Sequence, residues 1–175
     1  MPPSPKPARR RNRTGGGSAK ARRSAARLAA VQALYQIGLA GTEPEAVLAE
    51  FIKLRFGHEV DGVSYVAADP PLFSSIVRGT MARLADVDGM VAAALDPRLP
   101  FDRMELLLRS ILRAGTWELL ANAEVPARIV VTEYVEVGNA FYQGREPGMV
   151  NGVLDALARR LRPDEMTPPE PDAAP

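Results

Sequence analysis

Residues 129–137 have the sequence IVVTEYVEV. Their β-branched content and partial alternation of apolar and polar residues are typical of a strand. A longer window favours a helix, because Val130, Tyr134 and Val137 fall on one helical face. Pro126 stands where the first turn would begin, a position that proline tolerates well. No other segment offers a partner for a lone strand, so we predict a helix here and an all-α fold.

Helical spacing of apolar residues recurs along most of the remaining chain. It predicts helices over residues 24–39, 42–56, 71–95, 102–120 and 146–161. We expect the second of these to open with a capping box formed by Thr42 and Glu45, and residues 57–70 to form a loop.

The ends of the chain differ in composition from its body. Residues 1–19 are rich in proline, glycine and basic side chains, and residues 163–175 are acidic and rich in proline. Neither segment can bury a core, so both are expected to be disordered tails. The folded body is then residues 20–162, a compact helical domain. Pro97 and Pro100 indicate a junction between two small helix bundles, over about residues 20–95 and 101–162.

Composition excludes several classes of protein. The 175 residues are 46% hydrophobic and 25% charged, as in ordinary globular domains. No apolar run is long enough for a membrane helix, and we expect no secretory signal, because no apolar run follows the Pro- and Arg-rich start. The chain has no cysteine, which suits a reducing, cytoplasmic location, and one histidine, His58, which we expect on the surface. No phosphate loop, metal site or catalytic constellation is found, so we expect no enzyme activity, no metal and no cofactor.

The formal net charge of +1 conceals a strong asymmetry. Residues 1–27 hold nine basic residues and no acid, whereas the other 148 residues hold 13 basic and 21 acidic residues. A basic arm on a mildly acidic body is typical of a protein that binds a polyanion, most often a nucleic acid.

The basic segment runs directly into the first predicted helix. Within it, Arg23 and Arg27 are four residues apart and are expected to project from the same side. Arginine binds phosphate with two parallel donors and stacks on unpaired bases. Cations at a helix N-terminus oppose the macrodipole, so a purely structural role is less favourable. We therefore interpret this segment as an RNA-binding element.

Asn151 and Gly152 interrupt the apolar stripe of the last predicted helix. Both residues lower helix propensity, and glycine does so by about 1 kcal/mol relative to alanine. For Gly152 we expect a close approach of another helix. The role of Asn151 is left open.

Taken together, these segments resemble the NusB family of bacterial transcription antitermination factors. The resemblance covers about residues 20–162, and its order and spacing are specific although each motif alone is weak. Its motifs after the basic segment are AVQALY at 30–35, ILRAGTWEL at 111–119, VP at 125–126, VTEYVE at 131–136 and VNGVLD at 150–155.

The resemblance implies two helical bundles, no catalysis, and binding of single-stranded boxA RNA together with the ribosomal protein NusE. It also implies that this complex joins elongating RNA polymerase with other Nus factors in ribosomal RNA operons. The family's RNA-binding residues correspond to Lys20, Arg22, Arg23, Arg27 and Tyr35, with a second patch at Arg145 and Met149. At position 149 relatives often have an aromatic residue, and at position 145 some have an acid.

Three other functions are compatible with parts of the pattern. The first is a protein-interaction adapter or a self-associating protein, such as a homodimer, whose RNA site is covered. The second is an RNA-targeting appendage of a ribosomal RNA methyltransferase, for which the required cofactor domain is missing from this sequence. The third is a helix-turn-helix DNA-binding protein.

Overall fold

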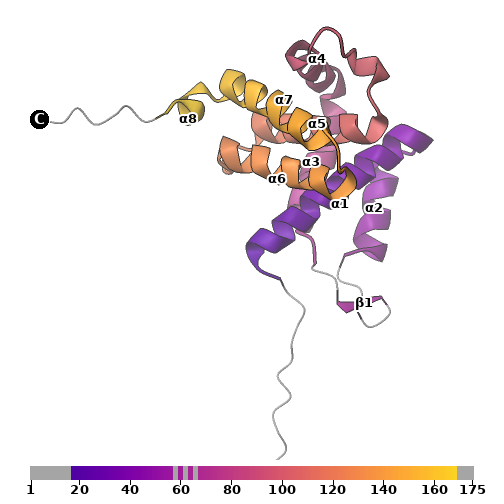
Figure 1. The fold of residues 1–175 in the computed structure, drawn as a ribbon. Helices are drawn as coiled ribbons and strands as arrows, with labels where there is room; N and C mark the ends of the chain where they lie inside the picture. Colours follow the sequence, from indigo (N-terminus) through magenta and orange to yellow (C-terminus); the bar gives the residue numbers. More distant parts are fainter. Residues whose placement is uncertain (1–16, 57–58, 61–62, 65–66, 169–175) are drawn as a thin grey trace, which may run out of the picture.

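The computed structural model describes residues 17–56, 59–60, 63–64 and 67–168 (Figure 1). The regular elements are α1 (Ala19–Ala40), α2 (Pro44–Leu54), β1 (Glu59–Val60), β2 (Val63–Ser64), α3 (Pro70–Ala82), α4 (Leu84–Ala94), the 3₁₀ helix η1 (Phe101–Arg103), α5 (Leu106–Ala121), α6 (Ala127–Phe141), α7 (Glu146–Leu161) and α8 (Pro163–Met166).

The all-α prediction is confirmed. The two strands are two residues each and pair only with one another, as an antiparallel ribbon in the region expected to be a loop. The tails expected over residues 1–19 and 163–175 lie partly outside the described residues, and His58 lies outside them altogether. Within the described part of the chain, no helix has the length and apolarity needed to cross a membrane.

The ambiguous segment 129–137 lies within α6, as predicted. Val130 and Tyr134 are fully buried, and Val137 is 6% exposed. The stripe packs against α5 and α7, and α6 and α7 lie side by side in Figure 1. Burial of this stripe at helical spacing overrides the strand propensity of the β-branched residues.

Three local predictions were wrong. The helix expected over 71–95 is broken at Arg83, whose backbone ψ of 28° leaves the helical range, and this break allows α4 to pack on α5 and α7. The helix expected from residue 102 begins instead at Leu106, after the 3₁₀ turn η1. The Thr42 capping box is absent: α2 has Glu43 at its N-cap without a side-chain bond, and Glu45 pairs with Arg78 at 2.7 Å.

The boundary expected at residue 162 was also wrong, because the chain remains packed beyond it. Met166 of α8 is only 3% exposed. Glu165 accepts a hydrogen bond from the backbone N–H of Ala127 at 2.7 Å and so caps α6. Arg162 donates to four backbone carbonyls at and after the end of α5, which satisfies acceptors that a helix C-terminus leaves free.

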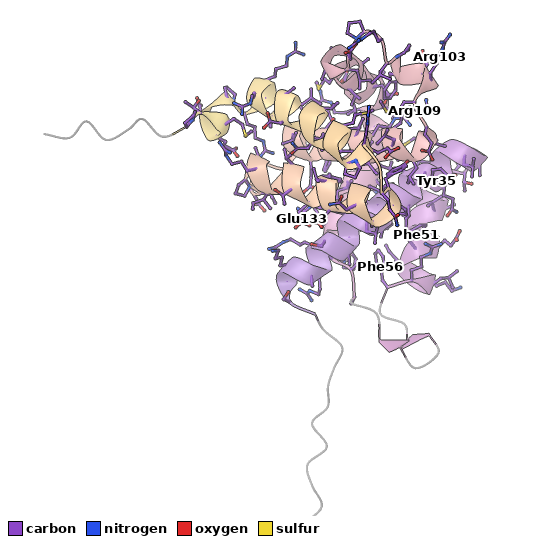
Figure 2. All side chains as sticks on the ribbon, viewed as in Figure 1. Tyr35, Phe51, Phe56, Arg103, Arg109 and Glu133 are labelled. Atoms are coloured by element: carbon purple, nitrogen blue, oxygen red, sulfur yellow. The ribbon has the colours of Figure 1, made fainter. Side chains whose placement is uncertain are left out.

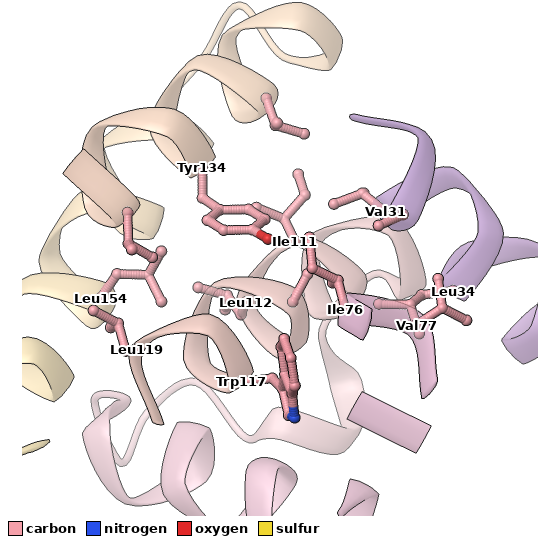
Figure 3. Packing of buried hydrophobic residues seen from close by; sticks show 14 of the residues in the cluster. Val31, Leu34, Ile76, Val77, Ile111, Leu112, Trp117, Leu119, Tyr134 and Leu154 are labelled. Atoms are coloured by element: carbon pink, nitrogen blue, oxygen red, sulfur yellow. The ribbon is translucent and has the colours of Figure 1, made fainter. Parts of the chain in front are cut away.

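The hydrophobic core is continuous across the junction expected between two bundles. Helix α5 is central to it, with contacts to α1, α3, α4, α6 and α7. Figure 3 shows Ile111 and Leu112 of α5 between Tyr134 and Leu154 on one side and Val31 and Val77 on the other. Gly115 permits this close packing, because a Cβ there would lie 2.7 Å from a methyl group of Leu154.

Candidate nucleic-acid interface

Three exposed cations stand at the start of α1. Ser18 caps the helix by accepting a hydrogen bond from the backbone N–H of Ala21 at 3.1 Å. Lys20, Arg22 and Arg23 follow in the first turns, and none of their side chains has a hydrogen bond or ion pair with another described residue. The first turn also has no acid to balance the macrodipole. These cations are free to bind an anion.

Arg27, one turn further along, is not part of this exposed set. It is 2% exposed and forms a two-pronged ion pair with Glu118 of α5, at 2.9 Å from Nε to Oε2 and 2.8 Å from the second nitrogen to Oε1. A third nitrogen lies 3.4 Å from Glu133 of α6. Burial alone would lower the pKa of Arg27, but the hydrogen bonds and charge of Glu118 raise it above its usual value.

Glu118 is the buried centre of a polar cluster, whose members are Ser24, Arg27, Glu118, Asn122, Glu133 and Tyr134. Besides Arg27, it accepts hydrogen bonds from the Tyr134 hydroxyl at 2.7 Å and from the Asn122 amide at 3.1 Å. Ser24 donates to Glu133 at 2.6 Å. Burial, followed by the charge and hydrogen bond of Glu118, raises the pKa of Tyr134 well above 10. The cluster joins α1 to α5 and α6, so it fixes where the start of α1 lies on the body.

The surface role expected for Arg27 is therefore contradicted. Arg23 is exposed on α1, whereas Arg27 is buried against Glu118 of α5 and Glu133 of α6. The sequence carried a signal for this, because Glu118 interrupts an apolar stripe and a buried carboxylate needs a cationic partner. Glu118 and Glu133 were not among the predicted site residues, yet they position α1.

A groove of about 780 Å³ opens beside the exposed cations. Lys20 and Arg23 line it from α1, Leu72 from α3, Trp117 from α5 and Ile129 from α6. Trp117 is 8% exposed and Ile129 is 50% exposed. The groove therefore has an apolar floor and two cations at its rim.

The remaining predicted residues lie toward the other end of α1. Figure 2 shows Glu133 on α6 near the N-terminal part of α1, whereas Tyr35 lies toward its C-terminal part. Lys20 and Tyr35 are 15 residues apart, which corresponds to about 22 Å along a helix. Tyr35 is half-buried and lies close enough to Tyr142 to affect its titration.

Tyr142 links the ends of two helices beside Tyr35. Its hydroxyl donates to Glu105, at the N-cap of α5, at 2.8 Å. Burial, then this hydrogen bond and the charge of Glu105, raise the pKa of Tyr142. The next loop leads to exposed Arg145, the N-cap of α7. Met149 is half-buried, with part of its side chain against the core.

The expectation of a close helix contact at Gly152 was wrong. A Cβ at Gly152 would meet nothing within 4 Å, and the same holds for Gly148 one turn earlier. Asn151 is exposed and its side chain has no hydrogen bond with another described residue. The propensity cost of Asn151 and Gly152 is therefore not offset by packing against other described residues.

The described residues contain no group of three or more histidines or carboxylates placed to hold a metal ion. The described residues instead provide exposed cations at the start of α1, the groove beside them, and exposed faces on α1 and α7.

Comparison with known proteins agrees with this arrangement. A model of the NusB family matches residues 24–159. The chain belongs to the NusB family. The transcription antitermination protein NusB of Agrobacterium fabrum is 48% identical over 140 residues, covering 80% of this chain and 85% of that protein. The NusB protein of a Bradyrhizobium species is 48% identical over 147 residues, covering 84% and 88%. Members of this family are transcription antitermination factors rather than enzymes.

Solved structures share the fold of this NusB family member. NusB of T. maritima aligns with a TM-score of 0.67 at 23% identity, covering 82% of this chain and 95% of that one. The NusB fold in a crystal structure of antitermination factors NusB and NusE with double-stranded RNA aligns with a TM-score of 0.66 at 22% identity, covering 81% and 98%.

Proposed function

We propose that this protein is an RNA-binding antitermination factor of the cytoplasm that binds single-stranded boxA-type RNA. The observation that carries the proposal is the set of free cations Lys20, Arg22 and Arg23 at the start of α1, in a chain of the NusB family. Lysine and arginine that lack internal partners can bind phosphates without first breaking an ion pair.

Two surfaces, at the two ends of α1, form the proposed RNA path. The first holds Lys20 and Arg23, and the second holds Tyr35, Arg145 and Met149. A separation of about 22 Å suits several nucleotides of an extended strand. Arg145 adds a cation at the N-terminus of α7, where backbone N–H groups also favour anions.

In this proposal Arg27 positions the start of α1 and does not contact the RNA. Its buried pair with Glu118 holds the first turns of α1 against α5 and α6. The exposed cations are thereby presented from a fixed site, which lowers the ordering cost of binding.

NusE is the proposed protein partner, and the complex would act on elongating RNA polymerase with other Nus factors in ribosomal RNA operons. The support is family membership and a solved NusB fold in complex with NusE and RNA. On α7, the exposed Gly148, Asn151 and Gly152 leave a bare face that a partner could approach closely.

Isothermal titration with a boxA RNA, with and without NusE, tests the proposal. We expect a stable heterodimer with NusE and tighter RNA binding in that form. Equal affinity with and without NusE would refute the cooperative part. Sizing the same mixtures tests the alternative, because a homodimer that excludes RNA would support a self-associating adapter instead.

A further inference from the structure

The interior of the groove beside α1 does not carry the positive charge of its rim. Its lining contains three basic and three acidic side chains, Lys20, Arg23, Arg27, Asp69, Glu124 and Glu133. Arg27 is held by Glu118, and Asp69 accepts a hydrogen bond from the backbone N–H of Leu72 at 3.1 Å. Apart from the rim cations Lys20 and Arg23, the lining therefore has more acidic than basic side chains. This excess of negative charge disfavours a phosphate inside the groove and suits an uncharged group that donates hydrogen bonds.

The floor of the groove is apolar and firmly built. Trp117 is locked against α3, since a Cβ at Gly79 would collide with its ring. Leu72 and Ile129 supply apolar surface from α3 and α6, and Ile129 is half exposed among the described residues. A volume of about 780 Å³ lies within the range of roughly 300–1,000 Å³ found for small-ligand pockets. A flat, uncharged ring system is therefore an appropriate occupant.

Glu133 provides one hydrogen-bond acceptor at the edge of this space. Its Oε2 accepts from Ser24 and Arg27, whereas its Oε1 has no hydrogen bond with a described residue. A carboxylate oxygen accepts from the exocyclic amino group of a base. The ring N–H of uracil or guanine can donate to it as well.

We propose that the groove holds one unpaired base of the bound RNA, with the flanking phosphates at Lys20 and Arg23. This inference rests on the proposed RNA-binding function and adds a base site to it. The base donates an N–H to the open oxygen of Glu133, and its faces contact Ile129 and the apolar floor. A nucleotide fits this arrangement because it joins a neutral ring to an anion that remains at the cationic rim.

An abasic scan tests the base site. The probes are single-stranded boxA RNAs of one sequence, each with one abasic residue at a different position, titrated into the full chain with NusE. We expect one position at which base removal weakens binding by about fivefold or more. N-methylation that blocks the N–H donor of the base at that position should weaken binding as well, since it removes the hydrogen bond to Glu133.

Ile129→Ala and Thr132→Ala form a matched pair of variants. Both residues are exposed on α6, but only Ile129 lines the groove. Ile129→Ala should weaken binding of intact RNA by about threefold to tenfold and should reduce the effect of the abasic position, because the two changes share the contact between the base and Ile129. Thr132→Ala should change neither. Trp117, the single tryptophan of the chain, gives a second readout. Its emission should change on saturation with intact RNA but not with RNA abasic at that position.

Three results would overturn the base site while leaving RNA binding in place. They are a flat abasic scan, an equal effect of the two alanine variants, and a loss of NusE binding alone in Ile129→Ala, which would make the groove a protein-docking surface. Absence of any RNA binding would instead refute the proposed function itself.

Discussion

Replacing Arg27 by methionine should destabilise the fold rather than remove an RNA contact. Glu118 is fully buried and accepts four hydrogen bonds, two of them from Arg27. Methionine keeps much of the apolar volume but leaves the Glu118 carboxylate without a counter-charge. Breaking a buried pair in this way costs about 3–5 kcal/mol of unfolding free energy. In a domain of this size the melting temperature should fall by roughly 6–20 °C.

Arg23→Ala is the matched control, since Arg23 is exposed on the same helix. It should change the free energy of unfolding by no more than about 0.5 kcal/mol while weakening RNA binding. Denaturant unfolding and RNA titration of both variants give the comparison. The double variant Arg27→Met with Glu118→Gln should recover part of the lost stability, because it removes the orphaned charge. Full stability of Arg27→Met together with reduced RNA affinity would refute the buried-cluster account.

Further substitutions test the helix faces and the buried phenol. Gly152→Ala should stabilise the protein by about 1 kcal/mol, because the added Cβ meets no atom within 4 Å. Gly79→Ala should destabilise it by about 1–3 kcal/mol, because the added Cβ collides with Trp117. Thermal melts in which Gly79→Ala is the more stable variant would contradict this packing. Met149→Phe should tighten RNA binding by a few tenths to about 1 kcal/mol. A lower melting temperature with unchanged RNA affinity would instead show that Met149 only packs in the core. The folded state keeps the Tyr134 proton above pH 10 while the unfolded chain loses it, so stability should fall as pH rises above 10, by up to about 1.4 kcal/mol per pH unit. Tyr134→Phe should flatten that fall in denaturant unfolding, and an unchanged pH dependence would argue against burial of the phenol.

Apolar periodicity was sufficient to predict most of the helices. It identified α6 despite β-branched residues, because the stripe through Tyr134 extends beyond the ambiguous stretch. It could not locate the break at Arg83, because the apolar pattern continues across it and only packing of α4 on α5 and α7 requires it. Apolar periodicity also failed to include residues 163–166 in the fold. Helix α8 is anchored by one buried side chain, Met166, and by long-range hydrogen bonds, and neither forms a periodic apolar pattern.

The candidate RNA interface was also predictable only in part, because the sequence pattern does not show which side chains meet in the fold. Composition revealed the basic arm, and the exposed Lys20, Arg22 and Arg23 agree with it. Helical spacing cannot distinguish an arginine facing solvent from one facing a buried carboxylate, so Arg27 was assigned to the surface. Its partner Glu118 is 91 residues away in the sequence, and only the fold brings the two together.

The salt dependence of RNA binding tests the central claim most directly. Affinity for a boxA single-stranded RNA is measured across salt concentrations for the wild type and for a variant with Lys20, Arg22 and Arg23 all replaced by alanine. A second variant carries alanine at three exposed arginines outside α1, Arg98, Arg103 and Arg160, and so loses the same charge. Single-strand binding has a log–log slope of about −0.7 per phosphate contacted, so the first variant should have a slope flatter by about two units. The second variant should retain the wild-type slope. Equal slopes for the wild type and the first variant, or equal flattening in both variants, would contradict a phosphate-binding site at the start of α1.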